Sequence, residues 1–342
     1  MSQGLSFALS VRAGTMALRP GPEITPAEGI RLVADLRNQA GKALGYVAEI
    51  TGLEAAAKRA ATTDVAITDR RGFVRGLNRM AQKLTEKVWA EEDWSWPATQ
   101  MMSVQLGTVT RLLAFRVLGF YDPFYEAPWG NGRLLLVAPN ILRQERDLNA
   151  DPRDFHLWIA LHEMAHAVQF AAAPWLAPWL KERLTQLLLA DEEPGRVARL
   201  VAAGRRLPEV FSDDPQADVS ATGLLSPAQV RILGEITATM SFLEGHADVI
   251  MDAVGPRIVK SVEELRPRFD ARKVASGRFE RGLRRLAGIE AKTAQYIQGA
   301  GFVRKVLAEV GHEGLNQFFS SPGALPTAAE MDQPSDWIRR VA

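Results

Sequence analysis

The chain has 342 residues, of which 47% are hydrophobic and 24% charged, so it has enough apolar material for one large domain or two lobes. Its 41 basic and 40 acidic residues leave a formal net charge of +1, which argues against a general attraction to nucleic acid. The lack of cysteine excludes disulfide bonds, a thiolate nucleophile and a cysteine-ligated metal, so any metal needs His, Asp or Glu ligands.

Hydrophobic periodicity predicts a mostly helical chain with a few short strands. Helical spacing covers residues 30–51, 73–89 and 104–118, and short apolar runs at residues 5–11, 65–68 and 133–138 indicate strands. Because these strands are few and short, we expect a small sheet in an α+β fold dominated by helix. The strand at residues 133–138, stopped by Pro139, is either an edge to which an extended peptide could add or a plain core strand.

A long helix with an explicit start signal is predicted in the middle of the chain. Asp151 can serve as its N-cap, Pro152 fits the first helical position, and Asp154 stands three residues after the cap. Acidic residues there also complement the positive end of the helix dipole. We expect this helix to continue through His166 and to stop before Pro174.

A second long helix is predicted in the C-terminal half. Its start signal is Ser226-Pro227, and we expect it to continue to Val254. Residues 211–223, rich in Asp, Ser, Pro and Gly, indicate a surface loop before it. Residues 275–310 indicate one or two further helices, with a break at a glycine-rich point.

No apolar stretch predicts export or a membrane span. The first one has no Lys or Arg before it and is interrupted by Arg12, which makes a poor secretion signal. The most apolar region, residues 155–180, contains several polar and ionisable side chains and is broken by Pro174 and Pro178, whereas a bilayer-spanning segment should be almost free of them. We therefore expect a cytoplasmic protein whose partners include neither nucleic acid nor a membrane.

Residues 162–166 form the H-E-x-x-H pattern within the first long helix. Residues four apart share a helical face, so His162 and His166 can reach one ion, and zinc binds neutral imidazole well. Glu163 directly follows a ligand, so it can take a proton from a zinc-activated water during attack on a carbonyl. Two histidines can share a helix by chance, but the apolar neighbours indicate a buried helix, where unpartnered imidazoles would be costly. The sequence therefore predicts a zinc site.

The third zinc ligand must come from elsewhere, because the long metzincin pattern needs Gly and His where this chain has Gln169 and Ala172. In the second long helix, Glu244 and Asp248 lie four apart on one face, while His246 points roughly 200° away from Glu244. We expect Glu244 to ligate zinc. Asp248 either accepts the other ring N–H of a ligating histidine or is an exposed acid. His246 fits better as a hydrogen-bonded packing residue.

Other polar residues give weaker signals. Lys292 and Tyr296 share a face of a later helix, and either could stabilise an oxyanion, although a structural role suits them too. We keep Tyr296 as a candidate catalytic residue. The basic run at residues 282–285 indicates a solvated helix face rather than a nucleic-acid site. His156 and His312 have no motif around them and are assigned no role.

The segments at residues 161–170 and 241–248 resemble the gluzincin pattern, H-E-x-x-H followed by E-x-x-x-D. More specifically, the chain resembles a bacterial family of zincin-like metallopeptidases, some of whose members are labelled as hydrolases associated with biosynthesis of the deazaflavin coenzyme. The resemblance covers the chain from about residue 30 to its C-terminus and also includes residues 49–53, 69–74, 292–306 (with the frame K-x-x-Q-Y-x-x-G-x-x-F), 325–327 and 334–338.

This resemblance implies a zincin-like fold with the active site in a cleft between an N-terminal lobe, residues 1–175, and a helical C-terminal lobe, residues 176–342. It implies His162, His166 and Glu244 as zinc ligands and Glu163 as the catalytic base. The long separation between the last histidine and the glutamate departs from thermolysin-like gluzincins, and the insertion could form a lid over the site.

The function that follows is zinc-dependent hydrolysis of a peptide or amide bond. One alternative is a non-catalytic binding or scaffold protein of zincin fold, against which the presence of Glu163 argues. Another is an accessory amide hydrolase of a coenzyme-biosynthesis pathway. Zinc, water and a carboxylate would serve a peptidase and such an amidase equally, so the sequence does not separate the two.

Overall fold

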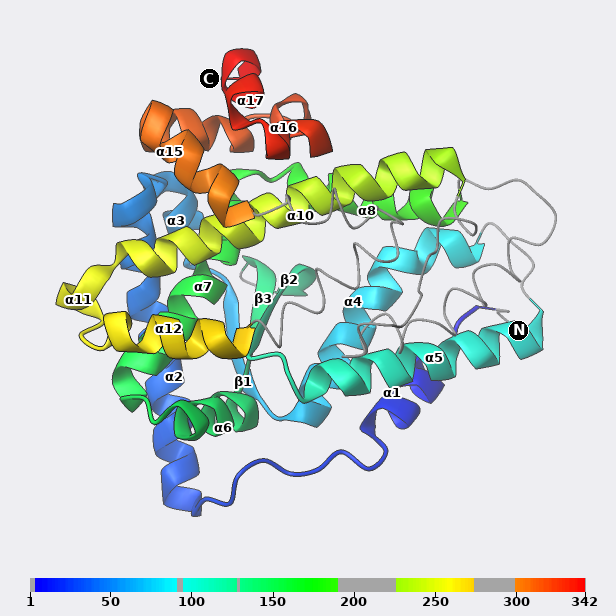
Figure 1. The fold of residues 1–342 in the computed structure, drawn as a ribbon. Coiled ribbons are helices and arrows are strands. Elements are labelled where there is room, and N and C mark those ends of the chain that lie inside the picture. Colours follow the sequence, from blue (N-terminus) through cyan, green and yellow to red (C-terminus); the bar gives the residue numbers. More distant parts are fainter. Residues whose placement is uncertain (1–3, 91–94, 128–129, 190–225, 274–298, 342) are drawn as a thin grey trace.

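The computed structural model describes residues 4–90, 95–127, 130–189, 226–273 and 299–341. Within them, helices surround one three-stranded sheet (Figure 1). The mostly helical α+β fold with a small sheet, expected from the sequence, is therefore confirmed.

The sheet consists of β1 (Asp64–Thr68), β2 (Gly119–Ala127) and β3 (Gly130–Val137), in the order β1-β3-β2. β3 pairs in parallel with β1 and antiparallel with β2, so that Leu134 lies opposite Val65 on one side and Tyr121 on the other. The expectation of a peptide-accepting edge at residues 133–138 is therefore wrong. Both sides of β3 are already paired, and the alternative of a core strand holds.

The outer strand β2 has no clear signal in the sequence. Asp122 and Pro123 interrupt its apolar residues, and its register with β3 shifts between Asp122 and Glu126. A proline is tolerated here because β2 is an outer strand with an irregular register. The preceding helix, α5 (Trp96–Ala114), accordingly ends before the residue 118 expected from its periodicity.

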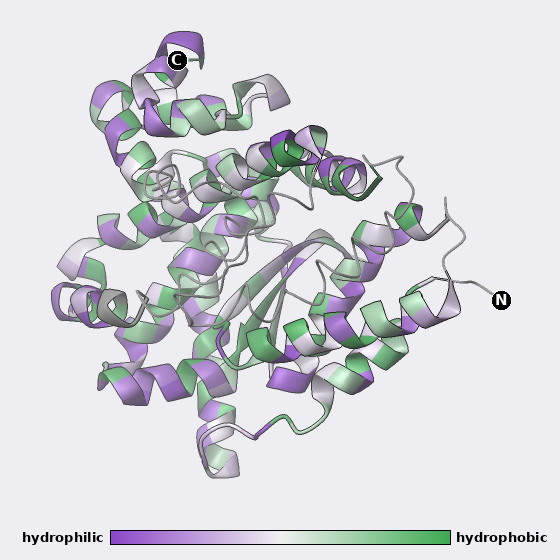
Figure 2. Ribbon diagram, turned by 45° about the vertical axis from the view of Figure 1, so that its right-hand side comes forward, coloured by the Kyte–Doolittle hydropathy of each residue, from purple (hydrophilic) through white to green (hydrophobic). Residues whose placement is uncertain are grey.

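The two faces of β3 are buried against different helices. Leu134 and Leu136 belong to a hydrophobic cluster with α2 (Pro26–Thr51) and α7 (Pro152–Ala172), whereas Val137 belongs to another with α4 (Arg70–Ala90) and α5. This alternation follows from the two-residue period of a strand. Figure 2 shows hydrophobic and hydrophilic residues interspersed along most helices and on the strands. The sheet is thus a middle layer, and α7 packs directly against it.

Residues 5–11, expected to add a strand, lie mostly in a helix, α1 (Phe7–Thr15). Ser6 caps this helix by accepting a hydrogen bond from the Leu9 amide. Small residues let α1 pack closely on α5: a Cβ added at Gly107 would lie only 2.5 Å from the carbonyl oxygen of Ser10. The apolar run is too short for its period to separate a strand from a helix, so tertiary packing decides.

Both long helices begin where their caps predict. The side chain of Asp151 accepts a hydrogen bond from the Asp154 amide at 3.0 Å at the start of α7. Ser226 and Gln229 form a complete capping box at the start of α10 (Pro227–Ala253). α10 crosses α7 and packs against it (Figure 1). This crossing brings the acidic residues of α10 to the H-E-x-x-H segment.

A second hydrophobic cluster joins α10 to the C-terminal elements. Phe242 of α10 stacks on Phe318 with 3.6 Å between ring centroids. Gly245 approaches α15 (Gly299–Leu315) so closely that a Cβ there would overlap the backbone of Gly299. The other described elements are α3 (Glu54–Ala60), α6 (Ala138–Leu148), α8 (Leu176–Leu189), α11 (Gly255–Ile258), α12 (Val262–Lys273), η2 (Asn316–Phe319), η3 (Pro322–Ala324), α16 (Ala328–Asp332) and α17 (Pro334–Val341).

Four expectations from the sequence concern larger parts of the chain: the absence of a membrane span, a surface loop, a further helical region and a division into two lobes. None of the described helices is long and apolar enough to span a bilayer. The loop expected at residues 211–223 and the helical region at residues 275–298 lie outside the described residues. The cluster around β3 contains Trp158 and Ile250, one from each side of the expected lobe boundary. The division into lobes at residues 1–175 and 176–342 stays a prediction.

His156, which no sequence motif singles out, connects the start of α7 to two other helices. Its Nδ1 lies 2.6 Å from Asp35 Oδ2 on α2, and its Nε2 lies 2.7 Å from Glu145 Oε2 on α6. Burial by itself lowers the pKa of this imidazole, but the two carboxylates outweigh burial, and the pKa of His156 is raised. When it is protonated, His156 of α7 pairs with carboxylates on α2 and α6 and so links three helices.

We expect His156→Gln to lower the free energy of unfolding by about 3–5 kcal/mol at pH 6, because it leaves two carboxylates without their buried cation. The raised pKa means that the stabilisation is complete below about pH 6.5, the value of free imidazole, and is lost as pH rises through the folded-state value. Urea unfolding at pH 6 and pH 9 measures this. His312→Gln is the control, and an equal loss for His156→Gln at both pH values would contradict the ion-pair account.

Candidate metal centre

The two histidines of the motif lie one turn apart on α7, a largely buried helix. Buried apolar side chains surround the motif, including Leu161 directly before it and Ala165 within it. The rings of His162 and His166 lie edge to face with centroids 4.9 Å apart. Their Nε2 atoms face each other at 3.3 Å. A buried helix thus directs two imidazole nitrogens to one point, as the four-residue spacing predicts.

Glu244 of α10 completes this cluster from the opposite helix. Its Oε2 lies 3.4 Å from Nε2 of His162, and its Oε1 lies 3.6 Å from Nε2 of His166. The Glu244 side chain is 52% exposed, so solvent or a ligand can reach the cluster from that side. Among the described residues, this is the one group of three or more His, Asp or Glu side chains whose ligand atoms converge, within 4.8 Å of one another.

These separations fit a tetrahedral zinc ion. With zinc–ligand bonds of 2.0–2.1 Å, two ligands at a tetrahedral angle are about 3.3–3.4 Å apart. The two Nε2 atoms are 3.3 Å apart, which equals that edge length, and one oxygen of the Glu244 carboxylate lies near each of them, Oε2 at 3.4 Å from His162 and Oε1 at 3.6 Å from His166. Two imidazoles and one carboxylate are also the ligand set of known hydrolytic zinc sites, which keep a fourth position open. The residues present therefore fit a catalytic zinc.

The pKa values of the two imidazoles are shifted in opposite directions. Burial by itself lowers the pKa of both. For His162, the nearby carboxylates of Glu244, Glu163 and Asp248 outweigh burial, and the pKa is raised. For His166, burial prevails and the pKa is lowered, so this ring is neutral at neutral pH, which is the form that binds a metal.

Glu163 lies beside the cluster but is not part of it. Its side chain is on α7 and almost fully buried, with 7% of the residue exposed. Burial raises its pKa to about 7, with Glu244 adding to the effect and His162 opposing it. A carboxyl group with this pKa can exchange a proton near neutral pH, which suits a general base.

Gly119, the first residue of β2, provides the space for Glu163. A Cβ built on Gly119 would overlap the carboxylate carbon of Glu163. The outer strand therefore begins directly over this carboxyl group, and only glycine leaves room for it. The sequence pattern marks Gly119 as a helix end and gives no sign of this contact.

We expect Gly119→Ala to reduce hydrolysis by at least about 10-fold while leaving metal affinity unchanged, because it displaces the Glu163 carboxylate and not a candidate ligand. Gly234→Ala, whose added methyl group meets nothing within 4 Å, is the matched control. Activity and metal titration of both variants test this. Full activity in Gly119→Ala would show that the position of Glu163 does not matter.

Gln169 lies at the centre of the polar network. It stands where the long metzincin pattern needs glycine. Gln169 is completely buried, and its Oε1 lies 2.9 Å from Nδ1 of His166. Its Nε2 donates to the carbonyl oxygen of Leu243 at 2.9 Å and lies 3.0 Å from Nδ1 of His246. Its motif spacing, three residues after His166, is the only signal that could have drawn attention to it.

His246 faces away from the two motif histidines into the aromatic cluster, stacked on Phe242 with 5.8 Å between centroids. Burial lowers its pKa to about 3, so it is neutral. Its Nε2 has no hydrogen-bond partner among the described residues. The packing role expected for His246 agrees with this position, although the ligand roles of the surrounding residues stay predictions.

Asp248 lies one turn after Glu244 and faces His162. Its Oδ1 is 3.7 Å from Nδ1 of His162, longer than a hydrogen bond, and its Oδ2 is 4.0 Å from Arg266 of α12. Arg266 is also paired with Asp252 at 3.2 Å. The expectation that Asp248 orients His162 stays a prediction. Lys292 and Tyr296 lie outside the described residues.

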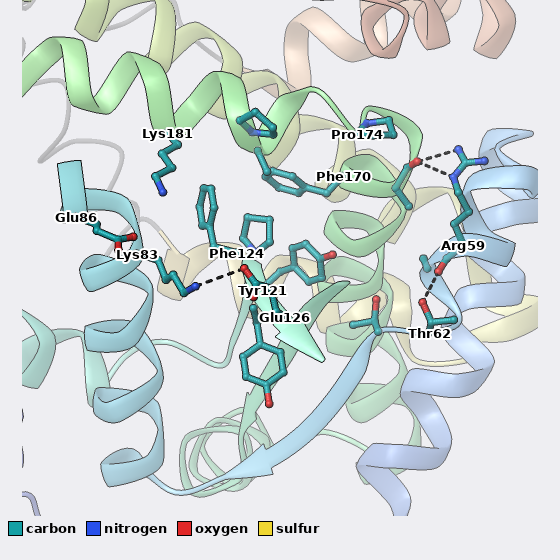
Figure 3. Close-up of a pocket in the computed structure, with 17 residues that line it drawn as sticks. Arg59, Thr62, Lys83, Glu86, Tyr121, Phe124, Glu126, Phe170, Pro174 and Lys181 are labelled. Atoms are coloured by element: carbon teal, nitrogen blue, oxygen red, sulfur yellow. Dashed lines mark hydrogen bonds and ion pairs between the residues drawn. The ribbon is translucent and has the colours of Figure 1, made fainter. Parts of the chain in front are cut away.

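A cavity of about 1010 Å³ opens beside the C-terminal end of α7. Its lining combines residues of β2, such as Tyr121 and Phe124, with Phe170 of α7 and Lys181 of α8, and Figure 3 shows these side chains gathered around one space. None of the three candidate ligands lines it. Strand β2 lies next to both places. Its first residue, Gly119, packs against Glu163, and Tyr121, two residues later, lines the cavity.

Comparison with known proteins identifies the family of this chain. No functionally curated protein matches the chain. A crystal structure of a proposed hydrolase with a novel fold from Chloroflexus aurantiacus has the same fold, with a TM-score of 0.67, 24% sequence identity and 98% of each chain covered. The family model described as zincin-like metallopeptidase matches residues 6–338. The chain therefore belongs to the zincin-like metallopeptidase family.

Proposed function

We propose that this protein is a zinc-dependent hydrolase that cleaves a peptide or amide bond. In this proposal His162, His166 and Glu244 hold the zinc, and Glu163 is the general base. The observation that carries it is the convergence of two Nε2 atoms and a carboxylate at separations close to the edges of a zinc tetrahedron. Membership in a family of zincin-like metallopeptidases supports the same reaction class.

Zinc at this position would supply Lewis acidity, polarising a carbonyl and lowering the pKa of a coordinated water to about 7. The residues of the chain supply the rest. Glu163, buried under Gly119 with a pKa of about 7, accepts a proton and can return it to the leaving group. Burial of α7 keeps bulk water away from this carboxyl group on the protein side.

The outer strand and the cavity support a peptide-like substrate. β2 begins over Glu163 and continues into the cavity lined by Tyr121, Phe124 and Phe170. In this proposal an extended substrate lies along β2, with its scissile bond at Glu163 and a neighbouring part in the cavity. Aromatic and proline side chains in the lining favour apolar groups of the substrate. An amide substrate of a biosynthetic pathway would use the same surface.

We expect the protein purified without chelators to contain about one zinc per chain, since the site offers three ligands from one chain. Elemental analysis measures this. The His162→Ala, His166→Ala double variant should lose the metal, whereas His312→Ala, which removes a histidine that is not a candidate ligand, should keep it. Unchanged metal content in the double variant would contradict the proposed site.

A further inference from the structure

The hydrogen bonds of Gln169 have only one consistent arrangement. Its amide contacts a backbone carbonyl, Leu243 O at 2.9 Å, and a carbonyl can only accept. The amide nitrogen must therefore face Leu243, because the flipped orientation would place two acceptors against each other. This fixes Oε1 toward His166, where it lies 2.9 Å from Nδ1. The orientation of the glutamine is thus set by the main chain of α10.

This orientation determines the tautomer of His166. An amide oxygen accepts only, so Nδ1 of His166 must carry the hydrogen. In a neutral imidazole, Nε2 is then unprotonated, and its lone pair is free. That is the nitrogen that faces His162 at 3.3 Å and Glu244 at 3.6 Å. The second hydrogen of the Gln169 amide points to Nδ1 of His246, which accepts it. The neutral His246 ring therefore carries its own hydrogen on Nε2.

The same side chain also links the two helices that form the cluster. Leu243 directly precedes Glu244, and its carbonyl is the point at which α10 is held by α7 through Gln169. Gln169 itself is completely buried, so water does not compete for these hydrogen bonds. One residue therefore sets both the protonation of one candidate ligand and the position of the backbone beside another.

We propose that Gln169 is a positioning residue of this site: it fixes His166 in the tautomer with a free Nε2 and ties that ring to the backbone that carries Glu244. It does not touch the substrate. The purpose of this arrangement rests on the proposed function. The tautomer itself does not, since it is present in the metal-free protein as well. Free histidine favours hydrogen on Nε2, so the arrangement is one that the protein must impose.

Long-range ¹H–¹⁵N NMR spectra of ¹⁵N-histidine-labelled, metal-free protein at about pH 9, where imidazole is neutral, distinguish the two tautomers. The signal of His166 is assigned by its loss in His166→Gln. The wild-type protein should show hydrogen on Nδ1 of His166. Hydrogen on Nε2 in the wild-type protein would overturn the proposal without any variant.

Two substitutions separate the two contacts of Gln169. Gln169→Leu removes both, so His166 should revert toward hydrogen on Nε2, and zinc affinity should fall by about 10–100-fold, as losses of an outer hydrogen-bond partner do. Gln169→Glu keeps an acceptor for Nδ1 but cannot donate to Leu243, so it should retain the tautomer and bind zinc more weakly than the wild-type protein.

Gln39→Leu is the matched control, because Gln39 is also buried and donates one hydrogen bond, to Asp35 at 3.0 Å, away from the site. It should leave both the tautomer and zinc affinity unchanged. An unchanged tautomer and zinc affinity in folded Gln169→Leu would overturn the proposal. Failure of the wild-type protein to bind zinc would instead refute the proposed function, while the tautomer spectrum would still decide the role of Gln169.

Discussion

Replacing Glu163 by glutamine is expected to lower hydrolysis by about 10²-fold or more while leaving zinc bound, because the substitution removes the general base and no ligand. The amide is nearly the same size as the carboxyl group, so it fits under Gly119 without the overlap that a methyl group there would cause. Mass spectrometry of a digested peptide mixture measures cleavage, and elemental analysis measures bound zinc.

The pH dependence of the reaction provides a second readout for Glu163. Burial raises its pKa to about 7, and a base works only when deprotonated, so activity should fall as pH decreases below about 7. A zinc ion beside it would move this fall to lower pH. The residual activity of Glu163→Gln should lack this acid limb.

Glu235→Gln is the control for this experiment, since Glu235 is a half-exposed glutamate of α10 paired with Arg183 at 3.3 Å. It should keep the activity and pH profile of the wild-type protein. Full activity in zinc-loaded Glu163→Gln would place the base elsewhere or dismiss the enzyme. Loss of zinc from Glu163→Gln would show that Glu163 is a ligand.

Replacing Glu244 by alanine is expected to cost more zinc affinity than the about 10–100-fold loss that accompanies removal of an outer hydrogen-bond partner. Among the residues that the structure describes, the Glu244 carboxylate is the acidic group that approaches both Nε2 atoms, at 3.4 and 3.6 Å. If Asp248 orients His162, Asp248→Ala should lower zinc affinity by about 10–100-fold. Its carboxylate lies 3.7 Å from Nδ1 of His162, the ring nitrogen that does not face the cluster.

The matched controls for Glu244→Ala are on the same helix. His246→Ala should leave zinc bound, because the His246 ring faces the aromatic cluster and Gln169 remains anchored on Leu243. Glu235→Ala removes a carboxylate two and a half turns away and should have no effect. Competition with a chromophoric chelator measures all of them. Wild-type affinity in Glu244→Ala, or loss of zinc in His246→Ala, would remove Glu244 from the site.

The features of the site that the sequence predicts are those set by short-range spacing. His162 and His166 are four residues apart on one helix, so their shared face follows from helical geometry alone. The caps at Asp151 and Ser226 are likewise local, and the structure confirms both. The family resemblance, confirmed by the match over residues 6–338, then associated Glu244 with this pair although α8 and a long insertion intervene.

The features that the sequence does not reveal depend on contacts between distant segments. Gln169 reaches Leu243 across 74 residues, and Gly119 meets Glu163 only because β2 is placed beside α7. The strand β2 itself is hidden by Pro123, which is tolerated only in an outer strand. At the N-terminus, packing against Gly107 turns an ambiguous apolar run into a helix. Periodicity carries no information about such partners.

The most direct test of the zinc assignment is an anomalous difference map collected at the zinc absorption edge from a crystal of the zinc-loaded protein. We expect one strong peak about 2.0–2.1 Å from Nε2 of His162, Nε2 of His166 and a carboxylate oxygen of Glu244. Glu163 should lie beside this peak without ligating it, and His166 Nδ1 should remain on Gln169. A zinc peak ligated by His246, or no peak among His162, His166 and Glu244, would contradict the account.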